Sequence, residues 1–295
     1  MTRTTTKGRT SLLEAQNPRA LKAKFISLLR DNSRAHRIYK VFADFCEMSA
    51  ISISNAFDKA QYEKREARYL QIVAGYSKEE VYRFAEMLGV FTLLCETGFR
   101  DHLGEIFMEL DMGDDARGQF FTPYEISSMM AQMTLTDARS LIEKNGYITI
   151  NEPACGAGGM VLAAAEAVQG LGVNYQQHIH VTAQDIDAQA VHMTYIQLAL
   201  FHVPAVVLHG NTLSLETWGH WVTPAHVMGA WDFRLHRRFN QAEQVVHEIK
   251  PVELPAVFAV DGDRKPLLGG ANHIEMMGEA VKSVVNKRVE QLDLF

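Results

Sequence analysis

The chain has 295 residues, 47% of them hydrophobic and 22% charged. This composition is typical of a globular protein of about two domains and excludes a disordered, collagen-like or coiled-coil chain. No apolar run approaches the roughly 18 residues that a membrane span needs, and the polar, basic start has no signal-peptide pattern. Three scattered cysteines, Cys46, Cys95 and Cys155, favour neither a disulfide framework nor a metal site, so we expect a cytoplasmic protein.

Charge is distributed unevenly along the chain. Residues 1–40 contain ten Lys or Arg and two acids, a net charge of +8, although the whole chain carries −6. The remaining residues therefore sum to −14. A basic end on an acidic body indicates either a contact with nucleic acid or a solvated terminus, and charge alone leaves both open.

The first half of the chain has helical periodicity. Apolar residues fall on one helix face within residues 21–29, 38–45 and 81–94. Ser77 followed by Glu80 predicts a capping box at the start of the last of these helices. We interpret these stripes as core and see no cofactor motif in them.

The pattern changes after residues 111–118 (DMGDDARG), which predict a surface loop. Strands are expected at 147–151, 178–183 and 205–208, with helices at 160–168 and 188–201 between them. This alternation is typical of a parallel, doubly wound sheet. A weaker signal follows, which indicates a strand at 257–260 and a final helix at 275–290.

The most informative motif is the glycine-rich turn after the first expected strand, NEPACGAGGM at 151–160. Gly156, Gly158 and Gly159 allow a tight turn and close approach of a ligand to the backbone. No GK[ST] or G-x-G-x-x-G pattern is present, which argues against nucleoside triphosphates and dinucleotides. Glu152 precedes the glycines, and an acid there repels phosphate and attracts an ammonium group.

Two further polar residues follow the next two strands. Asp185 occupies the position where such folds place a carboxylate against ribose hydroxyls, and Ile186 could cover an adenine ring. Asn211 offers a donor and an acceptor to a purine edge. Taken singly, each is better explained as an ordinary strand-end residue. Together with Glu152 they suit S-adenosylmethionine.

Two motifs resemble those of DNA adenine-N6 methyltransferases. NEPACGAGG is similar to the family's [DE]PxCGSGG loop, and GQFFTP at 118–123 is similar to the GQ[FY][FY]TP element of γ-type enzymes, especially the modification subunits of type I restriction systems. The resemblance covers residues 118–215 firmly and 20–215 loosely. It implies a cofactor site formed by Phe121, Thr122, Pro123, Glu152, Ala154, Cys155, Gly156, Gly158, Asp185, Ile186, Asn211 and Thr212.

The resemblance also implies a Rossmann-like α/β methyltransferase fold preceded by an all-helical domain. We therefore expect five segments: a basic tail at 1–17, a helical domain at 18–117, a cofactor-binding core at 118–232, an extension at 233–290 and a terminal peptide at 291–295.

The family's catalytic signature, [DNS]PP[YF], is absent because no two of the eight prolines are adjacent. In the family this segment holds a flipped-out adenine. The nearest candidate is the run Thr223, Pro224, Ala225 and His226. Trp218, Trp221 and Trp231 lie nearby in sequence and could stack on a base or pack the end of the sheet.

The chain ends Gln291-Leu-Asp-Leu-Phe295, which resembles the short peptide by which bacterial proteins dock on the replicative sliding clamp. Its leucines and Phe295 could fill an apolar pocket. The alternative is a helix end packed on the core.

These observations support two functional hypotheses. The first is a DNA adenine-N6 methyltransferase linked to restriction-modification or mobile DNA, which binds DNA alone or together with a specificity subunit. The second is an inactive cofactor-binding homologue that acts by binding DNA or the clamp. Methylation of an amino group on RNA or protein is a weaker third interpretation.

Overall fold

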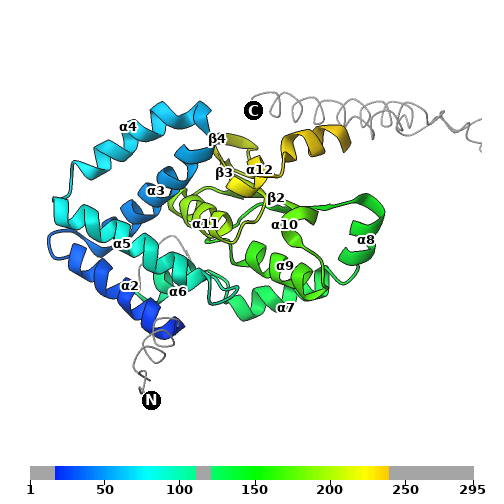
Figure 1. Ribbon diagram of the computed structural model, residues 1–295, viewed down its shortest axis with the longest axis horizontal. Coiled ribbons are helices and arrows are strands. Elements are labelled where there is room, and N and C mark those ends of the chain that lie inside the picture. Colours follow the sequence, from blue (N-terminus) through cyan, green and yellow to red (C-terminus); the bar gives the residue numbers. More distant parts are fainter. Residues whose placement is uncertain (1–16, 111–120, 239–295) are drawn as a thin grey trace, which may run out of the picture. The chain divides into compact units, whose positions relative to one another are not determined.

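The computed structural model describes residues 17–110 and 121–238 (Figure 1). All of these residues belong to one compact unit, Met1–Glu243. The expected loop at 111–118, the strand at 257–260, the helix at 275–290 and the terminal peptide lie outside the described residues.

The first described part is helical, as expected. Asn17 caps the first helix through its side-chain oxygen, and Pro18 occupies the first helical turn, where its missing N–H costs nothing. The capping box of Ser77 and Glu80 is confirmed, with both hydrogen bonds present. The elements are α2 (Pro18–Asn32), α3 (Ile38–Phe57), η1 (Lys59–Gln61), α4 (Tyr62–Val73), α5 (Lys78–Cys95) and α6 (His102–Glu109).

The second part forms a four-stranded sheet in the order β1-β2-β3-β4. Strands β1 (Ile148–Glu152), β2 (Ile179–Asp185) and β3 (Ala205–Asn211) are parallel, which confirms the three expected strands. Strand β4 (Glu216–Val222) is antiparallel to β3 and is not among the expected strands. The described sheet is therefore mixed.

Helices make the parallel connections. α9 (Gly159–Gly170) and the short α10 (Tyr175–His178) join β1 to β2, and α11 (Ala188–Leu200) joins β2 to β3. α7 (Tyr124–Thr134) and α8 (Ala138–Asn145) precede the sheet, and α12 (Pro224–Met228) follows it. None of the helices described in 17–110 and 121–238 is long and apolar enough to cross a membrane.

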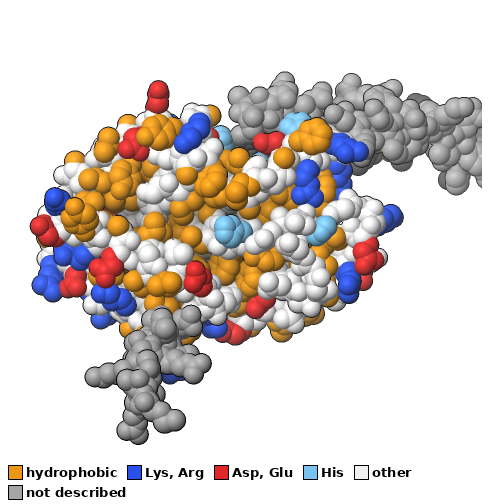
Figure 2. All heavy atoms as spheres, viewed as in Figure 1, with side chains coloured by type: hydrophobic (Ala, Val, Ile, Leu, Met, Phe, Trp, Pro, Cys, Tyr) orange, Lys and Arg blue, Asp and Glu red, His pale blue; other side chains and the backbone are white. Residues whose placement is uncertain are grey.

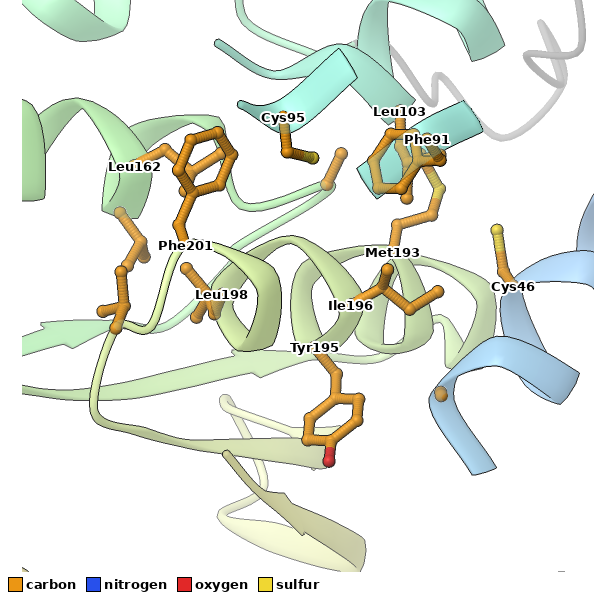
Figure 3. Packing of buried hydrophobic residues seen from close by; sticks show 14 of the residues in the cluster. Cys46, Phe91, Cys95, Leu103, Leu162, Met193, Tyr195, Ile196, Leu198 and Phe201 are labelled. Carbon is orange, nitrogen blue, oxygen red and sulfur yellow. The ribbon is translucent and has the colours of Figure 1, made fainter. Parts of the chain in front are cut away.

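One hydrophobic core joins the helical part to the sheet. On β2 and β3, Val181, Ala183 and Val207 are fully buried, whereas the residues between them are partly exposed. Figure 3 shows α11 inside this core, with side chains from α3, α5, α6 and α9 around it and Tyr195 directed toward the strands. The structure thus packs residues 18–110 and the sheet together within one unit.

Part of the basic N-terminal segment is neutralised within the fold. Lys22 pairs with Glu105 and Glu109, and Lys24 pairs with Glu86. Figure 2 shows Lys and Arg side chains next to acidic ones over the helical part at the left of the view. For the described residues 17–40, these pairs favour a solvated surface rather than a contact with nucleic acid.

Candidate functional site

The structure brings the three predicted strand-end residues to one edge of the sheet. Glu152 ends β1, Asp185 ends β2 and Asn211 ends β3, and the three strands run parallel. Hydrogen bonds connect the turn after β1 to the ends of the other two strands: Gly156 N donates to Asp185 Oδ2 at 2.8 Å, and Thr212 Oγ1 donates to the carbonyl of Pro153 at 2.6 Å. This is the edge at which open α/β sheets bind ligands.

The glycine turn has the geometry that its sequence predicts. Gly156 has φ 53° and Gly158 has φ 93°, both in the left-handed region that favours glycine. A Cβ on Gly156 would lie 2.9 Å from Cδ1 of Phe121, and one on Gly158 would lie 3.1 Å from Oγ1 of Thr194. A side chain is therefore disfavoured by both space and backbone conformation at Gly156, and mainly by backbone conformation at Gly158, which leads directly into α9.

The FTP element contributes through its first residue. The ring of Phe121 lies against Gly156 and 5.2 Å from the ring of Phe107. Thr122 and Pro123 are exposed, and Pro123 is the N-cap of α7. The structure thus places Phe121 next to the glycine turn, while the contact of Phe121, Thr122 and Pro123 with a cofactor stays a prediction.

The glycine turn is held by hydrogen bonds that involve three polar residues, which the sequence analysis does not identify. Thr194 Oγ1 donates to the carbonyl of Gly156 at 2.8 Å, and Gln197 Nε2 donates to the carbonyl of Ala157 at 2.7 Å. Gln197 Nε2 also donates to Asp101 Oδ1 at 2.8 Å, and this oxygen accepts from Gly104 N as well. The signal that could have found them is the spacing of Thr194 and Gln197, three residues apart on one face of a mostly apolar helix.

Burial shapes the ionisation of the site. It raises the pKa of Glu152, and the charge of Asp185 adds to this while the backbone N–H of Ala154 opposes it. It likewise raises the pKa of Asp185 against the hydrogen bonds from Asp187 and Gly156. Burial raises the pKa of Cys155 to about 12, so its thiol is neutral and is not a nucleophile at physiological pH.

The purine end of the predicted site has one correction. Asn211 Oδ1 accepts from the backbone N–H groups of Leu213 and Ser214, at 2.9 and 3.3 Å. Both lone pairs of this oxygen are therefore engaged in a turn, and the side chain can offer a purine only its NH₂ donor. Ile186 is 60% exposed next to Asp185, as a residue that covers a ligand ring would be.

The predicted base-binding run lies elsewhere, so that prediction is wrong. Thr223 accepts from Ala205 N and donates to the carbonyl of Val203, at the beginning of β3. The seven residues of β3 separate this point from Asn211, about 20 Å at 3.3 Å per residue. Thr223, Pro224, Ala225 and His226 are all buried.

The physical reason is that Thr223-Pro224 begins a helix. Thr223 is the N-cap of α12 and Pro224 lies in its first turn, a common helix start. His226 is hydrogen-bonded to His180 and Asp232 at 2.9 Å each. The tryptophans do not gather around this run: Trp231 packs on Tyr147 and His180, whereas Trp221 packs on α11.

The residues at this sheet edge fit an adenosyl cofactor with an ammonium group. A carboxylate for the ammonium group, a glycine turn that a Cβ would fill, a carboxylate at the ribose position and an exposed aliphatic side chain all lie there. Three parallel strands with this turn define a nucleoside-binding protein of the Rossmann-like α/β class.

Comparison with known proteins makes this more specific. Residues 102–245 match the family model described as N-6 DNA Methylase. The matched segment runs from α6 through all four strands, and its similarity to this family implies S-adenosylmethionine as the cofactor.

A crystal structure described as a putative class I S-adenosylmethionine-dependent methyltransferase from Listeria monocytogenes is similar at 15% identity and a TM-score of 0.36. The similarity covers 65% of this chain and 54% of that chain, so this chain spans about half the length of that protein. Comparison with curated proteins finds no match.

Proposed function

We propose that the chain transfers a methyl group from S-adenosylmethionine to N6 of adenine in DNA, in the cytoplasm and in a restriction-modification or mobile-DNA setting. The observation that carries this proposal is the convergence of Glu152, the Gly156 turn and Asp185 at one sheet edge within the segment that matches the N-6 DNA methylase family.

In this proposal the chain's residues bind the cofactor and fix its orientation. Glu152 binds the ammonium group of the amino acid part, Asp185 accepts from the ribose hydroxyls, and the Asn211 NH₂ donates to a purine nitrogen. The bound cofactor supplies an activated methyl group on a sulfonium. The remaining requirement is orientation of the acceptor amino group, which accounts for much of the rate of such transfers.

A second candidate is a cofactor-binding homologue that no longer transfers methyl groups. Two observations favour it: no two prolines are adjacent, and the run from Thr223 to His226 is buried at the far end of β3. Such a protein would act by occupying DNA or the clamp.

Transfer of tritium from labelled S-adenosylmethionine to plasmid DNA without host methylation separates the two candidates. The first predicts label in adenine N6. Calorimetric binding of S-adenosylmethionine without any transfer would favour the second. Adding candidate specificity subunits from the same replicon tests whether a partner is required.

We further propose that the terminal peptide from Gln291 to Phe295 docks on the sliding clamp. Deleting these five residues should abolish co-elution with purified clamp in gel filtration. Equal co-elution of full-length and truncated protein, or co-elution of neither, would contradict this proposal.

A further inference from the structure

A cleft between α3, α4 and β4 lies outside the predicted cofactor site. Its volume is about 280 Å³, close to the lower limit of roughly 300 Å³ for ligand pockets. It is therefore large enough for a single planar group and too small for a duplex. The lining residues are Glu47, Ile51, Gln61, Lys64, Arg65, Arg68, Trp218, Gly219, His220 and Trp221.

A β-bulge directs a tryptophan into this cleft. In the pairing of β3 with β4, His209 is opposite Gly219 and Gly210 is opposite Thr217, so Trp218 is the extra residue. Strand alternation alone would put Trp218 and Trp221 on opposite faces, yet both line the cleft. Bulges often re-aim a side chain near functional sites. Trp218 is 51% exposed, unusual for a ring of this size.

The opposite wall is built from cations held in place. Arg65 is buried, pairs with Asp58 at 2.6 Å, donates to the carbonyl of His220 at 2.7 Å and stacks over Trp221. Arg68 pairs with both carboxylate oxygens of Glu47. Lys64 is exposed at the rim, and no acid within the described residues lies at salt-bridge distance from it. Asp58 and Glu47 thus neutralise the two guanidinium groups, and the ammonium group of Lys64 is the charge that this wall offers to a phosphate.

The cleft lies beside the cofactor edge. Asp185 is opposite His209 on β3, and His209 is opposite Gly219 on β4, so the three form one row across the sheet. Adjacent strands are about 4.8 Å apart, which puts the β4 wall about 10 Å from the strand of Asp185. Trp218 also contacts the ring of His209, at 5.1 Å between centroids.

We propose that this cleft binds one unpaired nucleotide of single-stranded DNA, with its base on Trp218 and its phosphate near Lys64. Stacking on an aromatic ring needs an exposed base face, which a duplex does not offer, and combines with cationic contacts to the backbone in single-strand binding proteins. The inference rests on the proposed DNA substrate, and the role of the cleft there is to hold the unpaired strand next to the cofactor edge.

The test uses the full chain without cofactor and a fluorescein-labelled oligonucleotide of twelve thymidines, followed by anisotropy. Trp218→Ala should weaken binding about tenfold, since stacking contributes on this scale. Trp218→Phe, which keeps an aromatic face, should recover most of the affinity. Lys64→Ala should lower the slope of log K against log salt by about 0.7, the value for one lost phosphate contact on a single strand.

The control for Trp218→Ala is Phe233→Ala, which removes an exposed ring elsewhere on the chain, and the control for Lys64→Ala is Lys144→Ala on α8. We expect both controls to keep the affinity and the salt slope of the wild type. Thermal unfolding of each variant checks that the fold is kept. Absence of binding by the wild type, tighter binding to a duplex of the same length, or equal affinity of Trp218→Ala and wild type would overturn the inference. Because cofactor is omitted, failure of methyl transfer leaves this result unaffected.

Discussion

Gly156 is the residue on which the shape of the cofactor turn depends most directly. Its φ of 53° is a conformation that residues with a side chain rarely adopt. In addition, a Cβ at this position would lie 2.9 Å from the ring of Phe121. Gly156→Ala should lower the free energy of unfolding by about 1–3 kcal/mol and weaken S-adenosylmethionine binding. Chemical denaturation and calorimetry measure the two effects.

The control for this substitution is Gly172→Ala. Gly172 has φ 74° but no atom within 4 Å of its Cβ position, so it reproduces the backbone strain without the clash. Cofactor affinity should be unchanged in this control. Equal cofactor affinity of Gly156→Ala and Gly172→Ala would show that the turn tolerates a side chain at Gly156.

Asp185 has two roles that involve the same carboxylate. It accepts from Gly156 N, which orders the turn, and in the proposed function it also accepts from the ribose hydroxyls. Asp185→Ala should therefore weaken S-adenosylmethionine binding at least tenfold by calorimetry. Glu143→Ala on the exposed part of α8 should have no effect. Unchanged affinity in Asp185→Ala would contradict the ribose assignment.

The raised pKa values of Glu152 and Asp185 predict a dependence on pH. Both groups must be ionised to bind an ammonium group and to accept from hydroxyls. A carboxylate with a raised pKa takes up its proton at a higher pH than an exposed acid, whose pKa lies near 4. Affinity for S-adenosylmethionine should therefore fall on acidification before that range is reached. Constant affinity from pH 8 to pH 4 would argue against ionised partners.

Among the helices, α11 and the start of α6 form the support of the turn. Burial raises the pKa of Asp101 to about 6, although Gln197 and the N–H of Gly104 oppose the shift. The folded state thus holds this proton more tightly than the unfolded state, with its value of 3.8. For this group, the free energy of unfolding increases as the pH falls from above 6 toward 4.

Asp101→Asn removes this dependence and keeps the acceptor oxygen. It should stabilise the protein at pH 7.5 by about 1–3 kcal/mol and have little effect near pH 4. Urea unfolding at the two pH values measures this, with Asp137→Asn on the surface as control. A less stable Asp101→Asn at pH 7.5 would show that the charge itself is needed.

Most elements can be predicted because local signals and packing agree. The β-branched runs of β1 and β3 are followed by polar or glycine-rich turns, and the positions of the strand-end polar residues follow from them. β4 escapes prediction because ETWGHWV shows no clear alternation and contains Gly219 and a bulge at Trp218. The wrong prediction at Thr223-Pro224 has a different cause: the start of a helix resembles a remnant of a catalytic loop.

For the whole molecule, the described sheet ends at β1. In the described residues β1 pairs only with β2, and its five residues are exposed or half-exposed. Parallel sheets are usually covered on both sides.

The sequence can indicate the half of the fold that holds the cofactor, because its motifs are local. It cannot indicate how the acceptor is held, because the expected motif is absent.

The functional assignment depends on whether the ends of β1, β2 and β3 form a site for S-adenosylmethionine. Calorimetric titration of the full chain with S-adenosylmethionine decides this, alongside Glu152→Gln and the Gly156→Ala variant. We expect one site per chain in the wild type and weaker binding in both variants. No detectable binding at millimolar cofactor, or equal affinity in all three proteins, would contradict the assignment.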